Sequence, residues 1–178
     1  MYRDRIDLNG IWKFQYDPDN LQQAELIRFE QEAVVPMPWQ AQFQELREVA
    51  GTAWYLREFQ VPPEWCDYSI FFHCGAADYL TKGWLNGHYL GMNEGGYLPF
   101  EFELSKYLSF DSANSLVLRV SDYSENLLLN PDSQFSEIPH GKQSWYGPIS
   151  GIWQSAWLER RSYIHVASTF ISPDLNSG

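Results

Sequence analysis

Apolar and polar residues alternate along most of this chain with a period of two, which is the period of β-strands. Alternating or short apolar runs occupy residues 11–16, 51–61, 68–74, 79–91, 114–124, 150–161 and 163–168. The run at 79–91 contains Asn86-Gly87, a dipeptide that favours a two-residue type I′ hairpin, so it counts as two strands. About eight short strands separated by turns predict an all-β fold, an antiparallel β-sandwich or jelly roll.

Two segments depart from this alternation. Residues 21–33 have the composition of a helix, and a short helix is predicted there. The sequence "VPMPWQ", residues 35–40, carries two prolines within three residues, which excludes a central strand and predicts an edge strand or a loop. Neither segment is long enough to change the all-β prediction.

Composition and charge narrow the range of partners. At 178 residues the chain suits a single domain, and 17% of its residues are aromatic. A net charge of −11 leaves no basic stripe that could neutralise phosphates, which argues against nucleic acid and against anionic membrane surfaces. Aromatic faces and hydrogen-bonding carboxylates suit a neutral ligand such as a sugar.

Metal, cofactor and secretion motifs are absent from the sequence. Cys66 and Cys74 are the only cysteines and are predicted to be free thiols. The histidines lack the spacing of metal ligands, and no Ser-His-Asp or nucleophile-elbow motif is present, so no metal and no cofactor are expected. The N-terminus has no apolar signal segment and no run could span a bilayer, so a cytoplasmic location is expected.

Three glutamates within ten residues raise the question of a catalytic carboxylate pair, as in sugar-cleaving enzymes. Asn93-Glu94 precedes a glycine pair, a context that predicts a turn after the hairpin. Glu101 and Glu103 lie two positions apart on a predicted strand, which puts their carboxylates about 7 Å apart on one face. Phenylalanines occupy the opposite face, so this pair is interpreted as the solvated side of a half-buried strand.

The segment from residue 120 to residue 151 is long, irregular and polar, and it lies between two predicted strands. Loops of this length in compact domains are usually functional or disordered. Its leucines at 127–129 and the pair Trp145-Tyr146 argue against disorder. We expect these apolar groups to cover the sandwich or to contact other domains.

Six motifs, taken in order, resemble the N-terminal sugar-binding domain of glycoside hydrolase family 2, which includes β-galactosidases, β-glucuronidases and β-mannosidases. The likeness runs from about Leu8 to Glu159. The motifs are "LNGIWKF", "VPMPWQ", "GTAWYLREFQVPPEW", "WLNGHYLGMNEGGYLPFEFEL", "NSLVLRVSD" and "GIWQSAWLE". The resemblance implies a galactose-binding-like jelly roll at the front of a longer enzyme that hydrolyses terminal β-glycosides.

In that family both catalytic glutamates lie in a later (β/α)₈ barrel, so the resemblance implies no catalytic residue in this chain and no activity for the chain alone. It also implies that residues 1–166 form the sugar-binding domain, and that 167–178 are a linker and the first strand of an immunoglobulin-like domain. Carbohydrate and the downstream domains would be the partners, and the parent enzyme could form a homo-oligomer.

The family's loop corresponding to residues 120–151 reaches the rim of the sugar site, and "HGKQSWY" resembles a subgroup with a Gly-Lys-Gln element there. The substrate-binding candidates that follow are Asp122, Lys142, Gln143, Trp145 and Tyr146. Two departures count against strict galactose specificity. Some members of the family have an aspartate in the rim loop, and this chain has no aspartate at the corresponding position. Ala50 stands where some β-galactosidases have an asparagine.

Two other functions are considered. A free-standing carbohydrate-binding module would recognise sugars through exposed tryptophans and tyrosines. An adhesion or scaffold ectodomain of the same fold is disfavoured by the lack of a signal sequence and of paired cysteines.

Overall fold

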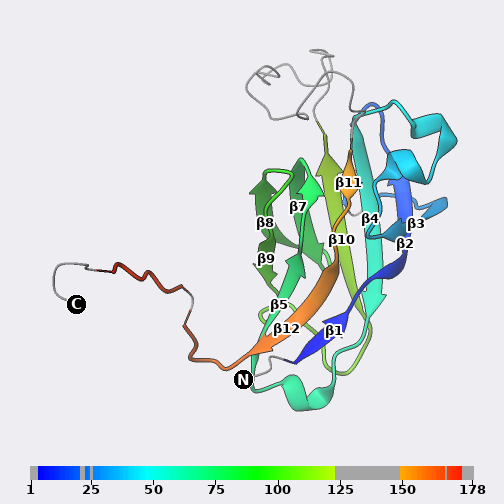
Figure 1. Cartoon of the computed structure of the whole chain (residues 1–178). Helices are drawn as coiled ribbons and strands as arrows, with labels where there is room; N and C mark the ends of the chain where they lie inside the picture. Colours follow the sequence, from blue (N-terminus) through cyan, green and yellow to red (C-terminus); the bar gives the residue numbers. More distant parts are fainter. Residues whose placement is uncertain (1–3, 21–22, 25, 123–148, 167, 174–178) are drawn as a thin grey trace.

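The computed structural model describes residues 4–20, 23–24, 26–122, 149–166 and 168–173. These residues form β-strands and three short 3-10 turns, with a six-stranded and a four-stranded antiparallel sheet stacked as a sandwich (Figure 1). The all-β sandwich predicted from the alternation is therefore confirmed. Within the described ranges no helix has the length and apolar character needed to cross a membrane.

The six-stranded sheet has the strand order β3-β2-β4-β10-β7-β8. In that order its strands are Gln31–Val35, Gly10–Tyr16, Thr52–Phe59, Asn114–Ser121, Leu80–Leu85 and His88–Glu94. The predicted Asn86-Gly87 hairpin joins β7 to β8, and both residues have positive φ, 51° and 82°, as a type I′ turn requires.

The four-stranded sheet has the order β1-β12-β5-β9. Its strands are Arg5–Asp7, Ala156–Arg161, Ser69–Cys74 and Phe100–Glu103. A separate two-stranded ladder pairs β6, Ala77–Asp78, with β11, Gly151–Ile152. The 3-10 turns span Trp39–Ala41, Gln44–Leu46 and Pro63–Trp65.

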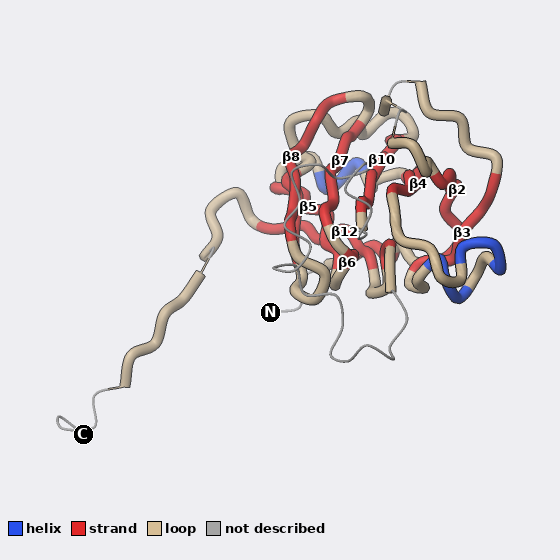
Figure 2. Tube along the Cα trace, turned by 90° about the horizontal axis from the view of Figure 1, so that it is seen from above, coloured by secondary structure: helices blue, strands red, loops and turns tan. Residues whose placement is uncertain are grey.

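Figure 2 shows the two layers from above. Large side chains from alternate strand positions fill the space between them. Phe14 of β2 packs edge-on against Tyr55 of β4, with ring centroids 5.1 Å apart, and it stacks on Phe43 at 4.7 Å. Phe72 of β5 comes from the other sheet and is fully buried. Each such side chain contributes roughly 1.5–3 kcal/mol through burial, so the core fixes both layers.

The predicted helix over residues 21–33 is wrong in the described part of that range. Gln31 to Ala33 begin β3, and no helix appears among residues 23–24 and 26–30. β3 pairs with β2 and buries Ala33 and Val35 at the sheet edge. Edge pairing with burial of alternate residues outweighs the weak local preference for helix. The proline-rich segment follows as a loop, one of the two predicted alternatives, and its Trp39 is fully buried.

The predicted strand over residues 163–168 is also wrong for the described residues of that range, 163–166 and 168. The described residues beyond β12 run away from the sandwich, and none of them pairs with a strand (Figures 1 and 2). Tyr163, Ile164 and Val166 are 85%, 89% and 71% exposed. Alternation alone does not hold a strand when no neighbouring strand is present. The run at 150–161 also divides into β11 and β12, and its alternate residues Ile152, Ala156 and Leu158 are buried.

Candidate functional site

Asp122 lies directly after β10, at one end of the sandwich, and two hydrogen bonds hold it there. Its backbone N–H donates to the carbonyl of Gly51 at 2.7 Å. Its Oδ2 accepts a hydrogen bond of 2.5 Å from the Ser150 hydroxyl. Gln40 fixes that serine, since its Oε1 accepts from Ser150 N–H at 3.0 Å and its Nε2 donates to Ser150 Oγ at 2.6 Å. The half-buried carboxylate of Asp122 is thus oriented by a hydrogen-bonded chain.

Asp78 in β6 is the second carboxyl group of this region. It is only 7% exposed, and its carboxyl forms neither an ion pair nor a hydrogen bond with the residues that the structure describes. The side chain lies against the backbone of Gly96. A Cβ added to Gly96 would lie 2.5 Å from Asp78 Cγ and 2.7 Å from Oδ2, so only glycine permits this approach.

Burial, followed by the nearby charge of Asp122, raises the pKa of Asp78 from 3.8 to about 7. An aspartate with this pKa is partly protonated at neutral pH, and it can then donate a hydrogen bond as well as accept one. Asp78, Asp122, Ser150 and Gln40 are called the acidic cluster below.

Two aromatic residues stand beside the acidic cluster. Trp153 Nε1 donates to the Gly96 carbonyl at 2.8 Å. Tyr97 packs edge-on against Trp153, with centroids 6.1 Å apart, and remains 53% exposed. Burial, and then the charges of Asp78 and Asp122, raise the pKa of Tyr97, which keeps its hydroxyl protonated. Carboxyl, hydroxyl and aromatic groups together match the hydroxyls and apolar faces of a sugar.

Of the predicted site residues, the structure places Asp122 in this cluster. Lys142, Gln143, Trp145 and Tyr146 lie outside the described residues. Ala50, where the asparagine of some β-galactosidases would stand, is one residue from Gly51, the backbone partner of Asp122. The resemblance therefore pointed to two positions that the fold brings together.

Sequence reasoning missed Asp78, Gln40 and Ser150. The available signal for Asp78 was its position in "GAADYL", where one acid interrupts an otherwise apolar run. Such an acid is buried if the run is a strand, and it then needs a partner or a raised pKa. Gln40 and Ser150 gave no comparable signal, because they are 110 positions apart and meet only through the fold.

The prediction that Asn93-Glu94 form a turn is wrong. Both residues belong to β8, paired with Thr81 and Leu80, and the turn begins afterwards at Gly95, whose φ is +126°. The left-handed conformation needs the glycine, so the strand continues up to it. Glu94 is exposed and accepts a hydrogen bond of 3.3 Å from the Tyr79 hydroxyl.

The interpretation of Glu101 and Glu103 as the solvated face of a strand is confirmed. Both are exposed on β9, while Phe100 and Phe102 are buried. Arg161 donates to both carboxylate oxygens of Glu101, at 2.9 and 2.5 Å. These hydrogen bonds lower the pKa of Glu101, which makes it a poor general acid.

The described residues include no group of three or more His, Cys, Asp or Glu side chains placed to hold a metal ion. Cys66 and Cys74 are both free thiols, as predicted, the first exposed and the second buried. Burial raises the pKa of the Cys74 thiol to about 12, so Cys74 is an unreactive core residue.

Comparison with known proteins gives a consistent result. Residues 6–162 match the family model "Glycosyl hydrolases family 2, sugar binding domain". A β-glucuronidase of Paenibacillus borealis is 32% identical over 111 residues, which cover 58% of this chain and 19% of that protein. A β-galactosidase of Thermoanaerobacter pseudethanolicus is 24% identical over 168 residues, covering 94% and 21%.

A β-glucuronidase from Ruminococcus gnavus has a similar fold, with a TM-score of 0.73 over 89% of this chain and 29% of that one. At 23% identity this likeness bears on the fold. The chain spans about a fifth of the length of the two relatives named above. Since the family model covers nearly the whole chain, the chain belongs to the sugar binding domain family of glycosyl hydrolases family 2.

Proposed function

We propose that this chain is the N-terminal part of an enzyme that hydrolyses terminal β-glycosides, and that its acidic cluster forms part of the rim of the sugar site. The proposal rests on the environment of Asp78. This residue is only 7% exposed, and its carboxyl has no hydrogen-bond or ion-pair partner among the described residues. It is also close enough to Asp122 for the charge of Asp122 to raise its pKa. Such a pair offers one donor and several acceptors to sugar hydroxyls.

The same geometry supports a binding role without bond cleavage. A glycosidase needs two carboxyl groups on opposite sides of the scissile bond. Glu101 and Glu103 share one sheet face, and Glu101 is held by Arg161. The names of the relatives support a β-glucuronide or a β-galactoside as the substrate of the parent enzyme. Lys142, Gln143, Trp145 and Tyr146 remain our further candidates for contacts at the rim.

The proposal extends to the residues after β12. Phe170 and Ile171 are 92% and 81% exposed, and Tyr163 and Ile164 are equally open. Contiguous exposed apolar groups usually mark a contact surface. This supports packing of the segment against a following domain of the parent, which we propose is immunoglobulin-like and precedes a catalytic barrel.

The purified chain is expected to release no nitrophenol from nitrophenyl β-glucuronide or nitrophenyl β-galactoside. An absorbance assay tests this, with the variant Glu101→Gln assayed in parallel. Turnover by the chain that the Glu101→Gln variant loses would contradict the proposal, because a contaminating glycosidase would be equally active in both preparations.

A further inference from the structure

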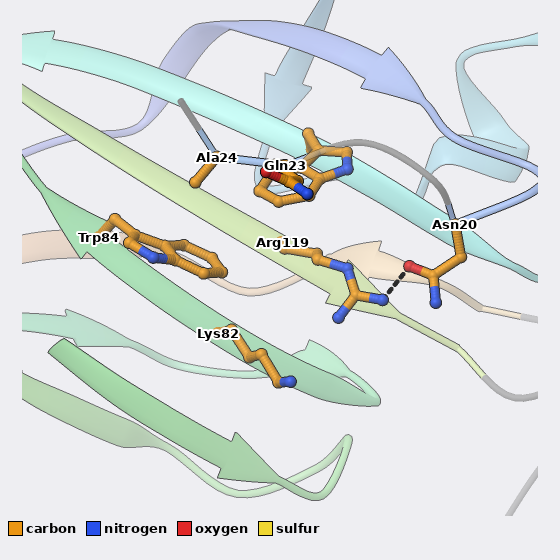
Figure 3. A pocket seen from close by; sticks show the side chains of 7 residues that line it. Asn20, Gln23, Ala24, Lys82, Trp84 and Arg119 are labelled. Atoms are coloured by element: carbon orange, nitrogen blue, oxygen red, sulfur yellow. Dashed lines mark hydrogen bonds between the residues drawn. The ribbon is translucent and has the colours of Figure 1, made fainter. Parts of the chain in front are cut away.

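The outer face of the six-stranded sheet carries a hollow of about 370 Å³ (Figure 3). Three neighbouring strands, β4, β10 and β7, line it together with Asn20, Gln23 and Ala24, which follow β2 in the chain. Its lining includes Trp54, Lys82, Trp84, Arg119, Asn20 and Gln23. The hollow falls within the roughly 300–1,000 Å³ range of small-ligand sites.

Two cations lie side by side in this hollow. The strand register places Arg119 of β10 directly opposite Lys82 of β7, and like charges at such positions repel each other. Arg119 lies over the Trp54 ring. It also donates a hydrogen bond to the carboxamide oxygen of Asn20 (Figure 3). Lys82 forms no ion pair and no hydrogen bond with any residue in the described ranges. An anion between the two side chains would offset their repulsion.

The surrounding groups determine what kind of anion fits. Trp84 is half-buried, with its ring 5.5 Å from the rings of both Trp54 and Tyr89. Tyr89 is 51% exposed, so the aromatic surface continues outward from the hollow. Gln23 adds an amide that can both donate and accept hydrogen bonds. An aromatic face with amide groups suits a sugar ring, and the cations suit a carboxylate on that ring.

We propose that this hollow binds a uronic acid unit of a saccharide, with the carboxylate between Lys82 and Arg119 and the ring against Trp84. The proposal goes beyond the sugar-rim function, because the hollow shares no residue with the acidic cluster. A polyphosphate such as nucleic acid is a poor alternative, since two cations in a chain of net charge −11 provide too little attraction.

The test is an NMR titration of the ¹⁵N-labelled chain with methyl β-glucuronide, with methyl β-glucoside as the neutral control. We expect shifts of the Trp84 indole N–H and of the amides around Lys82, with a Kd on the order of 1–10 mM. The glucoside should bind at least about 5-fold more weakly, and added salt should weaken only the glucuronide.

The variant Lys82→Gln should weaken glucuronide binding at least about 5-fold, the loss expected when one charged hydrogen bond is removed. Lys106→Gln is the matched control, because Lys106 also lies over an aromatic ring, 5.0 Å from the Tyr107 centroid, and its replacement removes the same charge. The control should bind like the unmodified chain. Equal binding of glucoside and glucuronide, equal losses in both variants, or shifts confined to the acidic cluster would each overturn the proposal.

Discussion

Replacing Asp78 with asparagine should stabilise the chain in a pH-dependent way. Below about pH 3, well under the ordinary pKa of 3.8, the carboxyl is protonated in both the folded and the unfolded chain. Between its ordinary pKa of 3.8 and the folded value of about 7, the unfolded chain loses the proton first, so the free energy of unfolding falls as pH rises. The full difference corresponds to about 4 kcal/mol at 1.36 kcal/mol per pKa unit.

The asparagine side chain of the Asp78→Asn variant cannot ionise and has nearly the same shape as aspartate, so the variant avoids this cost. Partial hydration of the unmodified carboxylate will reduce it, and we expect the variant to be roughly 2–4 kcal/mol more stable at pH 8. At pH 4.5 the difference should be only about 1 kcal/mol, because the folded carboxyl is still protonated there while the unfolded one, with its ordinary pKa of 3.8, is already mostly ionised. The difference must widen between these pH values, because the folded and unfolded chains bind different numbers of protons there.

Urea unfolding followed by tryptophan fluorescence, from pH 4.5 to pH 8.5, measures this difference. Asp111→Asn is the control, since Asp111 is exposed and its replacement removes the same charge. Its effect should stay small at every pH. If Asp78→Asn were neutral or destabilising at pH 8, the carboxylate of Asp78 would have a stabilising partner, and the inference of a buried, unpaired acid would be refuted.

Two further substitutions test the packing around the sites. Gly96→Ala should lower the free energy of unfolding by roughly 1–3 kcal/mol, measured by thermal unfolding, because the added Cβ overlaps Asp78. Adding Asp78→Ser to that variant should restore most of the lost stability. If the double variant were as unstable as Gly96→Ala alone, the contact between Gly96 and Asp78 would be contradicted. Arg161→Met should cost roughly 1.5–3 kcal/mol, because Glu159 is 1% exposed and would lose its 2.9 Å charged hydrogen bond while keeping its ion pair with Arg5 at 3.2 Å. The exposed Arg47→Met should be neutral within about 0.5 kcal/mol, and equal effects would refute the ion-pair argument.

Sequence patterns predicted a structural element well where the element depends only on residues close together in the sequence. The Asn86-Gly87 turn depends on two residues with positive φ, and the inward face of β10 depends on simple alternation. Elements that need a distant partner were mispredicted. β3 forms because β2 pairs with it, and residues 163–168 fail to form a strand because no neighbouring strand in the described part of the chain pairs with them.

The candidate site was harder to predict than the fold for the same reason. Asp122 could be named because the resemblance marks the start of the rim loop. Asp78 and Ser150 approach it only after β6 pairs with β11, where Asp78 lies opposite Gly151. The spacing of these residues in the sequence does not predict that they meet. The only sequence feature that indicates the site is an acidic residue, Asp78, within an apolar run.

The most direct test of the sugar-rim function is an NMR titration of the chain with nitrophenyl β-galactoside, a neutral glycoside that lacks the carboxylate required by the Lys82 hollow. We predict shifts centred on Asp122, Gly96 and the Trp153 indole N–H, with a Kd on the order of 10 mM. Asp122→Asn should abolish these shifts, and the anomeric proton signal of the glycoside should stay unchanged throughout. Shifts that avoid the acidic cluster, or loss of the glycoside signal by hydrolysis, would contradict the proposed role.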